Sequence, residues 1–362
     1  MNQVLVIGAG RVGRTIVHFL GAEEGYRVRI ADVHPERAAA VADEVEVAEA
    51  FEGSVADAAG LEKAMDGMQA VISAAPFTAN MLIAEVAAKC GLHYLDLTED
   101  VKVTQFTKDL AKTAETAFVP QCGVAPGFIS LAGLHVIEQF DEVDQLTLRV
   151  GALPEQPNNR LKYNLTWSTE GLVNEYLHPC EVLRNGEPTE VPALEAKEEV
   201  VIEGVTYEAF TTSGGLGTLG HTYKGKVRRM DYKTMRYPGH LELIRFLLDD
   251  LGFRRRPEDL VEIFHRSIPA TNDDFVLISV RGLGTKNGRY EERTWWRKIH
   301  GLYVGGHFFT GIEVTTAAGV CGIAHLLLAG EAPRKGFYRV EDFSFDHFMA
   351  SPFGRYYARP GL

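Results

Sequence analysis

The chain has 362 residues, which is enough for two domains with large cores. Its hydrophobic content of 46% and its charged content of 24% are ordinary for a soluble globular protein. The formal net charge of −12 argues against a general nucleic-acid binder, because the chain has no excess of cations to displace phosphate counterions. The four cysteines lie far apart and form no C-x-x-C pair, so we expect reduced thiols, no metal centre and a cytoplasmic location.

The longest apolar stretch, residues 317–329, contains His325 and is too short to span a bilayer. The apolar run at residues 4–7 reads as a strand rather than as the core of a signal peptide. We therefore expect no membrane partner and no nucleic-acid partner.

Residues 1–32 follow the order strand, glycine-rich turn, helix, strand. The β-branched run at 4–7 predicts a strand buried on both faces, residues 15–20 predict the helix, and residues 26–31 predict the second strand. The turn is a G-x-G-x-x-G fingerprint made of Gly8, Ala9, Gly10, Arg11, Val12 and Gly13. Its position between a strand and a helix predicts a dinucleotide site, whereas the glycines alone would be weak evidence.

The three glycines have different tasks. Gly8 permits the tight turn, Gly10 lets the backbone approach a pyrophosphate, and Gly13 lets the helix pack close to the strand. The N-terminus of that helix then offers N–H groups and a positive dipole end to the phosphates. Asp32 stands where a carboxylate accepts both ribose hydroxyls and repels a 2′-phosphate, which favours NAD over NADP. Arg37 lies close enough to leave NADP open.

Up to about residue 120, strand and helix patterns alternate, which predicts an α/β fold with a doubly wound parallel sheet. The expected helices cover 35–45, 81–90 and 106–116, with another beginning at 61–65; the expected strands cover 51–57, 70–75, 93–96 and 117–122. Ligands of such a sheet gather beyond the carboxyl ends of the strands. We expect the adenine beside Asp57, and the nicotinamide beside a group of strand ends formed by Ala75, Pro76, Asp96, Cys122, Gly123 and Pro126.

The pattern changes near residue 140. A mainly antiparallel sheet is predicted from strands at 143–152, 207–212, 227–232, 275–282 and 290–296, with Asn287-Gly288 as a hairpin turn. Residues 241–250 predict an amphipathic helix, and residues 316–329 predict a helix that returns to the first domain. The expected architecture is a Rossmann domain at 1–127 and 316–362, with a mixed α+β substrate-binding and oligomerisation domain inserted at 128–315.

In the second domain, Arg236 stands between a predicted strand and a predicted helix, where its guanidinium is well placed to fork onto a substrate carboxylate. Thr234 and Tyr237 offer hydroxyl donors beside it. An arginine that ties its own loop together explains the pattern equally well. Tyr163 and Trp167 read as core aromatics from composition alone.

Six stretches of the chain carry a resemblance to one enzyme family. They are GAGRVG at 8–13, CGVAPGF at 122–128, LKYNLTWSTEGLVNEYLHP at 161–179, VLRNGEPTEVPAL at 182–194, TSGGLGTL at 212–219 and YKTMRYPGHLE at 232–242. On these motifs the chain resembles the saccharopine dehydrogenase-like oxidoreductases over nearly its whole length. The segment 161–242 is similar to the lysine 6-dehydrogenase branch. The motifs are specific for the family and less specific for the substrate.

The resemblance implies a Rossmann domain, an inserted mixed domain, a C-terminal return and a homo-oligomer, commonly a dimer. It also implies that Arg236 meets the substrate carboxylate. We predict Tyr163, Thr234 and Tyr237 as further substrate contacts. The implied reaction is the oxidative deamination of the ε-amine of L-lysine with NAD. Two alternatives stay open: a saccharopine dehydrogenase acting on a secondary amine, and a non-catalytic NAD-binding regulator.

One stretch departs from that branch. After Asp96 the chain reads Leu-Thr-Glu-Asp, where the resembled enzymes carry glycine- and histidine-rich residues. Glu99 and Asp100 either act at the nicotinamide or cap the following helix. A lysine amine has a pKa of about 10.4, so the site must lower this pKa or supply a base. Glu99 and His178 are the two candidates for that base.

Overall fold

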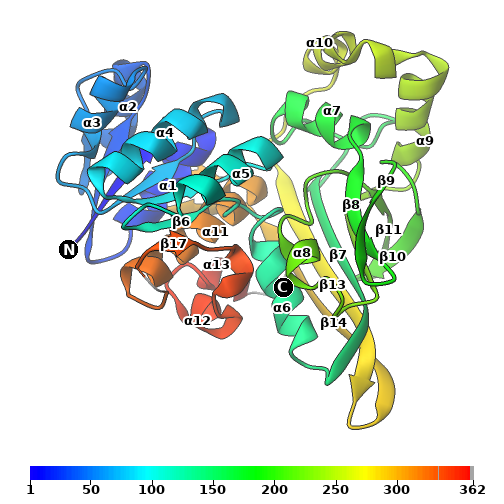
Figure 1. Cartoon of the computed structure of the whole chain (residues 1–362). Coiled ribbons are helices and arrows are strands. Elements are labelled where there is room, and N and C mark those ends of the chain that lie inside the picture. The colour runs from blue at the N-terminus through cyan, green and yellow to red at the C-terminus, as the bar shows by residue number, and fades with distance from the viewer. Residues whose placement is uncertain (333, 359–362) are drawn as a thin grey trace. The chain divides into compact units, whose positions relative to one another are not determined.

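The computed structural model describes residues 1–332 and 334–358, which divide into two compact units (Figure 1). Unit 1 comprises Met1–Leu131, Leu302–Phe309 and Glu313–Ala358, and unit 2 comprises Ala132–Gly301 and Thr310–Ile312. These units are defined by packing and do not test the predicted domains. The domain boundaries expected at 127/128 and 315/316 remain a prediction.

Unit 1 is built on a seven-stranded parallel sheet with the strand order β17-β6-β5-β4-β1-β2-β3. The strands are β1 Asn2–Ile7, β2 Tyr26–Ala31, β3 Ala48–Ala50, β4 Ala70–Ser73, β5 His93–Asp96, β6 Ala117–Val119 and β17 Gly336–Phe337. The chain winds outward in both directions from the boundary between β1 and β4. This confirms the doubly wound Rossmann arrangement.

The helices of unit 1 are α1 Arg11–Gly21, α2 Pro35–Ala42, α3 Ala58–Met65, α4 Phe77–Cys90, α5 Val101–Leu110, α12 Phe345–Ala350 and α13 Arg355–Ala358. Two further helices, α6 Phe128–Ile137 and α11 Gly311–Leu328, have residues in both units. On one face Leu5 and Val71 of the sheet pack against Leu61 of α3 and Ile83 of α4. Burial of these apolar side chains holds the strand ends in fixed positions.

The third strand lies at Ala48–Ala50, so the strand predicted at 51–57 is wrong. The cause is local chemistry at the end of that range. The Asp57 carboxylate accepts a hydrogen bond from the Gly60 N–H (2.8 Å) and caps α3, which draws the segment into a helix start. The predicted contact between Asp57 and adenine stays untested.

Helix α11 begins at Gly311, five residues before the predicted start at 316. The Asp274 carboxylate of β13 accepts hydrogen bonds from the N–H groups of Gly311 (2.6 Å) and Ile312 (3.3 Å), so a distant residue caps this helix. By length and composition α11 is apolar enough to cross a membrane, but 78% of that window is buried inside the structure. This burial is typical of a core helix.

Unit 2 contains an eight-stranded sheet with the path β10-β11-β12-β7-β13-β14, to which β8 adds beside β12 and β9 beside β8. Its strands are β7 Glu142–Pro154, β8 Cys180–Arg184, β9 Glu187–Val191, β10 Glu198–Ile202, β11 Val205–Thr211, β12 Arg229–Arg236, β13 Asp274–Lys286 and β14 Arg289–His300. The pairing is antiparallel except between β12 and β7. This confirms the mainly antiparallel sheet.

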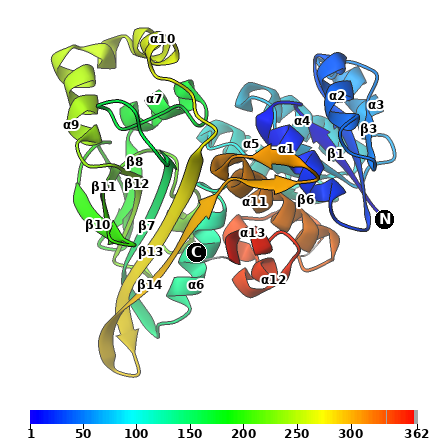
Figure 2. The same ribbon diagram turned by 180° about the vertical axis from the view of Figure 1, so that it is seen from behind.

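The long β13–β14 hairpin is prominent in Figure 2. Asn287 and Gly288 at its tip both have positive φ, 50° and 73°, which is the conformation of a type I′ turn and confirms the predicted hairpin. The helices of unit 2 are α7 Thr169–Leu177, α8 Leu219–Thr222, α9 His240–Arg245 and α10 Pro257–Ser267, with a π-helical turn at Phe246–Asp250 and a 3-10 turn at Phe253–Arg255. A short hairpin of β15 Leu302–Val304 and β16 His307–Phe309 belongs to unit 1.

Candidate functional site

The glycine-rich turn after β1 shows which glycines the fold itself requires. Gly8 has a φ of +103°, and an added Cβ there would lie 2.7 Å from the Ala74 carbonyl oxygen. An added Cβ on Gly13 would lie 1.8 Å from the Gly8 carbonyl oxygen. An added Cβ on Gly10, in contrast, would meet no atom within 4 Å. Packing therefore explains Gly8 and Gly13, whereas the open space at Gly10 fits the approach of a ligand.

Helix α1 begins at Arg11, directly after this open position. Its N-cap residue, Gly10, supplies no side-chain cap, and the first turn contains no acidic residue. An anion is therefore the natural partner for the N–H groups of this end of the helix. Arg11 pairs with Glu313 of α11 (2.6 Å), which holds the cationic side chain beside the turn. These residues fit a dinucleotide pyrophosphate.

Asp32 follows β2 and is 8% exposed. Its Oδ2 accepts a hydrogen bond from the Ala9 N–H (2.7 Å), and its Oδ1 accepts one from the His34 N–H (2.9 Å). An ionised carboxylate offers about four lone-pair positions, so it has capacity for two ribose hydroxyls as well. Asp32, which we predict to bind the ribose, thus also shapes the glycine-rich turn.

Asp96, at the end of β5, is completely buried. Its Oδ1 accepts hydrogen bonds from the N–H groups of Thr98 and Gln121 (both 3.0 Å), and its Oδ2 accepts one from the Tyr94 hydroxyl (2.8 Å). Burial raises the pKa of Asp96 to about 6 against these hydrogen bonds. The carboxylate thus fixes the loops after β5 and β6. The predicted direct contact with the cofactor stays untested.

The loop after β6 is tightly turned. Gly127 has a φ of +133°, and a Cβ there would lie 2.0 Å from the Gly123 carbonyl oxygen. The Ala125–Pro126 peptide is cis. Burial raises the pKa of the Cys122 thiol well above its usual range, which leaves a neutral thiol. Near β4, Ala75 is half-buried, and the exposed Pro76 forms the N-cap of α4.

Glu99 and Asp100, between β5 and α5, have separate tasks. The Asp100 carboxylate accepts a hydrogen bond from the Val103 N–H (2.8 Å) and caps α5. Desolvation, and secondly the Asp100 charge, raise the pKa of Glu99 to about 7. Glu99 is an exposed residue, so solvent and a substrate can reach its carboxyl group. A carboxyl group with this pKa is suited to proton transfer near neutral pH.

Arg236 is the last residue of β12 and not part of a loop, because the strand runs four residues beyond its predicted end at 232. Its guanidinium is buried, donating from Nε to the Tyr176 hydroxyl (3.2 Å) and from Nη1 to Thr234 Oγ1 (2.7 Å). Glu175 is 3.6 Å from its Nη2 atom, and the Tyr163 ring lies 5.1 Å from the guanidinium carbon. Three of the four predicted substrate contacts are thus brought together.

A chain of hydrogen bonds continues from this guanidinium. His240 Nδ1 is 2.9 Å from the Leu161 carbonyl oxygen, which can only accept, so Nδ1 carries the proton. His240 Nε2 therefore accepts from the Tyr176 hydroxyl (3.0 Å), and this assigns the tautomer. Burial and the nearby Arg236 charge lower the pKa of His240 to about 3, so the imidazole is neutral.

Two other predicted residues lie apart from this cluster. The Tyr237 hydroxyl donates to the Pro154 carbonyl oxygen (3.0 Å), and its ring contacts Tyr207. His178 is an exposed residue at the C-cap of α7. Sequence reasoning missed Glu175 and Tyr176 as partners of the guanidinium. The sequence signal for them is their position in segment 161–179, one of the family motifs, part of which forms α7.

The parallel sheet, its glycine-rich turn and the acid after β2 define a dinucleotide-binding protein of the Rossmann class, here joined to a second unit with its own mixed sheet. The chain belongs to the saccharopine dehydrogenase family. The NADP binding domain of saccharopine dehydrogenase matches residues 4–119, and the saccharopine dehydrogenase C-terminal domain matches residues 123–354.

Among curated proteins, the chain is 23% identical over 263 residues to the saccharopine dehydrogenase (NADP+, L-glutamate-forming) of Schizosaccharomyces pombe, covering 70% of this chain and 58% of that protein. The chain therefore spans little more than half of that relative. Among solved structures, the apo saccharopine dehydrogenase (L-Glu forming) of Saccharomyces cerevisiae has a TM-score of 0.79 at 16% identity, with 98% of each chain covered.

A second solved structure, the homospermidine synthase of Legionella pneumophila in complex with NAD, has a TM-score of 0.68 at 12% identity. It covers 99% of this chain and 90% of its own. At these identities both structures show that the fold is shared.

Proposed function

We propose that the protein is an NAD-dependent oxidoreductase that acts on an amine group of an amino acid, with the ε-amine of L-lysine as its substrate. The dinucleotide site in this proposal rests on two features of the glycine-rich turn. The space beside Gly10 is open, and the Asp32 carboxylate lies next to the same turn. The family relationship supports amine chemistry. The choice of lysine rests on the similarity of segment 161–242 to the lysine 6-dehydrogenase branch.

The preference for NAD rests on charge. The named relative from Schizosaccharomyces pombe uses NADP+, and the matching domain model is described as NADP binding. In this chain a carboxylate follows β2, and a 2′-phosphate placed beside that carboxylate would be repelled. The exposed Arg37 of α2 is the residue that favours NADP, since an arginine near this position can accommodate the 2′-phosphate.

Each unit has its own task in this proposal. In unit 1, the N–H groups at the start of α1 hold the pyrophosphate, and Asp32 accepts the ribose hydroxyls. In unit 2, Arg236 holds the substrate carboxylate by replacing its 3.6 Å ion pair with Glu175, the longest of its polar contacts. The bound nicotinamide supplies a hydride acceptor for the carbon that bears the amine.

The amine must lose a proton before the hydride leaves, because a protonated amine cannot form an imine. The ε-ammonium group has a pKa of about 10.4, so a base is needed near neutral pH. Glu99 is our candidate for that base, since its pKa is raised towards neutrality. Water then hydrolyses the imine to the semialdehyde and ammonia. The exposed His178 is the alternative base.

A direct assay tests this proposal. We expect NADH to form when the purified protein is mixed with NAD and L-lysine alone. NADH from saccharopine but not from lysine would replace the proposal with the saccharopine dehydrogenase alternative. Normal NAD affinity with no turnover on either amine would favour the non-catalytic NAD-binding regulator.

We further propose a homo-oligomer, in line with the family resemblance, and a cytoplasmic location, in line with the four scattered cysteines. Its partners in this proposal are small molecules rather than nucleic acids or membranes. The net charge of −12 supports the exclusion of nucleic acid. Light scattering of the eluting peak in size-exclusion chromatography tests the oligomer. A mass of one chain at micromolar concentration would contradict it.

A further inference from the structure

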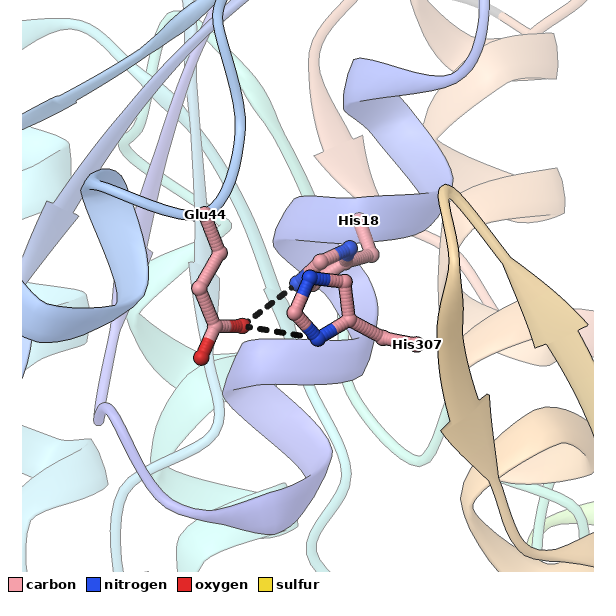
Figure 3. A group of neighbouring side chains, drawn as sticks. All are labelled: His18, Glu44 and His307. Atoms are coloured by element: carbon pink, nitrogen blue, oxygen red, sulfur yellow. Dashed lines mark hydrogen bonds and ion pairs between the residues drawn. The ribbon is translucent and has the colours of Figure 1, made fainter.

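Three side chains from distant parts of the sequence meet within unit 1. His18 comes from α1, Glu44 from the segment after α2, and His307 from β16 (Figure 3). The Glu44 Oε2 atom lies 2.7 Å from His18 Nε2 and 3.9 Å from His307 Nδ1, and the three atoms are all within 4.8 Å of one another. We call these residues the His-Glu-His cluster.

The donor set is one that a metal ion recognises. Two imidazole nitrogens and one carboxylate oxygen are the ligands of many three-residue zinc sites, in which a water takes the fourth position. The His18 side chain is 3% exposed, whereas the side chains of Glu44 and His307 are 28% and 35% exposed. The cluster therefore has a buried side, which fixes His18, and an open side, through which an ion and its water can enter.

We propose that the His-Glu-His cluster binds one divalent transition-metal ion of the zinc class, with His18, Glu44 and His307 as its protein ligands. Two ligand atoms of a tetrahedral zinc ion lie about 3.4 Å apart. The two distances from Glu44, 2.7 and 3.9 Å, bracket this value. Small rotations of the exposed Glu44 and His307 side chains would bring all three ligands to coordination distance.

Arg14 balances the negative charge of Glu44 when no metal ion is bound. Its Nε donates to Glu44 Oε2 (2.6 Å), and its Nη2 donates to His307 Nδ1 (2.7 Å). The guanidinium therefore contacts two of the proposed ligand atoms and supplies the positive charge that Glu44 requires. The side chain is 30% exposed and lies over the Phe309 ring, so it can withdraw towards solvent. Metal binding and the Arg14 contacts exclude each other.

The ion would join three segments of unit 1: the helix that follows the glycine-rich turn, the segment after α2, and the short β15–β16 hairpin. Because an ion that binds only the folded state raises the free energy of unfolding, we expect it to stabilise unit 1. The proposal does not depend on the substrate or on the cofactor.

The experiment uses the full chain without a histidine tag, titrated with Zn²⁺ by calorimetry and with Co²⁺ by visible absorption. We expect one ion per chain and the intense visible bands of four-coordinate Co²⁺. Arg14→Gln should bind at least about tenfold more tightly, because the competing cation is gone. His307→Ala and Glu44→Gln should each weaken binding at least about tenfold.

The matched control is His347→Ala, since His347 forms another imidazole–carboxylate pair, with Glu331 in the same unit, outside the cluster. This variant should bind like the wild type. Thermal unfolding without metal verifies that each variant is folded, and added Zn²⁺ should raise the Tm of the wild type and of Arg14→Gln. Failure of Arg14→Gln to bind either ion, or unchanged affinity in both His307→Ala and Glu44→Gln, would overturn the proposal.

Discussion

The carboxylate of Asp32 accepts a hydrogen bond from the backbone N–H of Ala9, with 2.7 Å between Oδ2 and N. Asp32, which follows the second strand, is therefore structurally linked to the glycine-rich turn that follows the first strand. Its hydrogen bond shapes the turn, and in our proposal its charge selects the ribose while the turn meets the pyrophosphate. Dinucleotide preference and turn geometry should consequently change together when Asp32 is altered.

Asp32→Asn should lower the preference for NAD over NADP. Asparagine has a single acceptor oxygen for the N–H groups of Ala9 and His34, and it lacks the charge that repels a 2′-phosphate. Hydrogen bonds to charged groups contribute about 1.5–3 kcal/mol, so the ratio of the two Kd values should shift by about tenfold or more. Fluorescence titration with NADH and NADPH measures both constants. Asp109→Asn, an exposed carboxylate on α5, is the control, and an unshifted ratio in Asp32→Asn would remove the ribose assignment.

Gly10→Ala and Gly13→Ala should fail in different ways. An added Cβ on Gly10 meets no protein atom, so this variant should keep a wild-type Tm and lose NAD affinity by about tenfold or more, because the methyl group occupies the pyrophosphate approach. An added Cβ on Gly13 meets the Gly8 carbonyl oxygen at 1.8 Å, so that variant should lose stability. Calorimetric melting and NADH titration separate the effects. Equal NAD affinity of Gly10→Ala and wild type would count against the site.

Tyr176→Phe should disturb the substrate carboxylate site. The lost hydroxyl accepts from Arg236 and donates to His240, so two buried groups lose a partner, at a cost of about 1–3 kcal/mol in the free energy of unfolding. KM for the amino acid should rise several-fold, and kcat should change less. Tyr290→Phe, an exposed tyrosine of the same unit, is the control. If neither Tyr176→Phe nor Arg236→Lys alters KM, Arg236 does not bind the substrate.

The pH profile should identify the base. The raised pKa of Glu99 means that the carboxylate becomes available only as the pH approaches about 7, so kcat/KM should rise with pH through that region. Asp100→Asn keeps a capping side chain but removes the negative charge that raises this pKa, so the rise should move to lower pH. Glu99→Gln should abolish it. A rise that persists in Glu99→Gln and disappears in His178→Ala would assign the base to His178.

Much of unit 1 could be predicted because its signals are local. The glycine-rich turn, the flanking strands and Asp32 fall within a short stretch, and each residue type has a backbone reason to be there. The tip of the β13–β14 hairpin could also be predicted, because Asn287 and Gly288 both adopt positive φ easily. Such features depend on residues close together in sequence.

The strand predicted at 51–57 failed for a local reason, because Asp57 caps α3. The other errors arose where distant residues decide the structure. The edge strand β3, with the sequence Ala-Glu-Ala, carries little β-propensity of its own and forms because β2 pairs with it. The start of α11 depends on Asp274, and the surroundings of Arg236 depend on α7. The His-Glu-His cluster unites residues 18, 44 and 307, so no local pattern could have indicated it.

Every role proposed for unit 1 requires that it binds a nicotinamide dinucleotide. The most direct measurement is an equilibrium titration of the purified wild-type chain with NADH, followed by fluorescence and repeated with NADPH. We predict saturable binding of one NADH per chain, tighter than that of NADPH. Absence of saturable binding for both dinucleotides would contradict it.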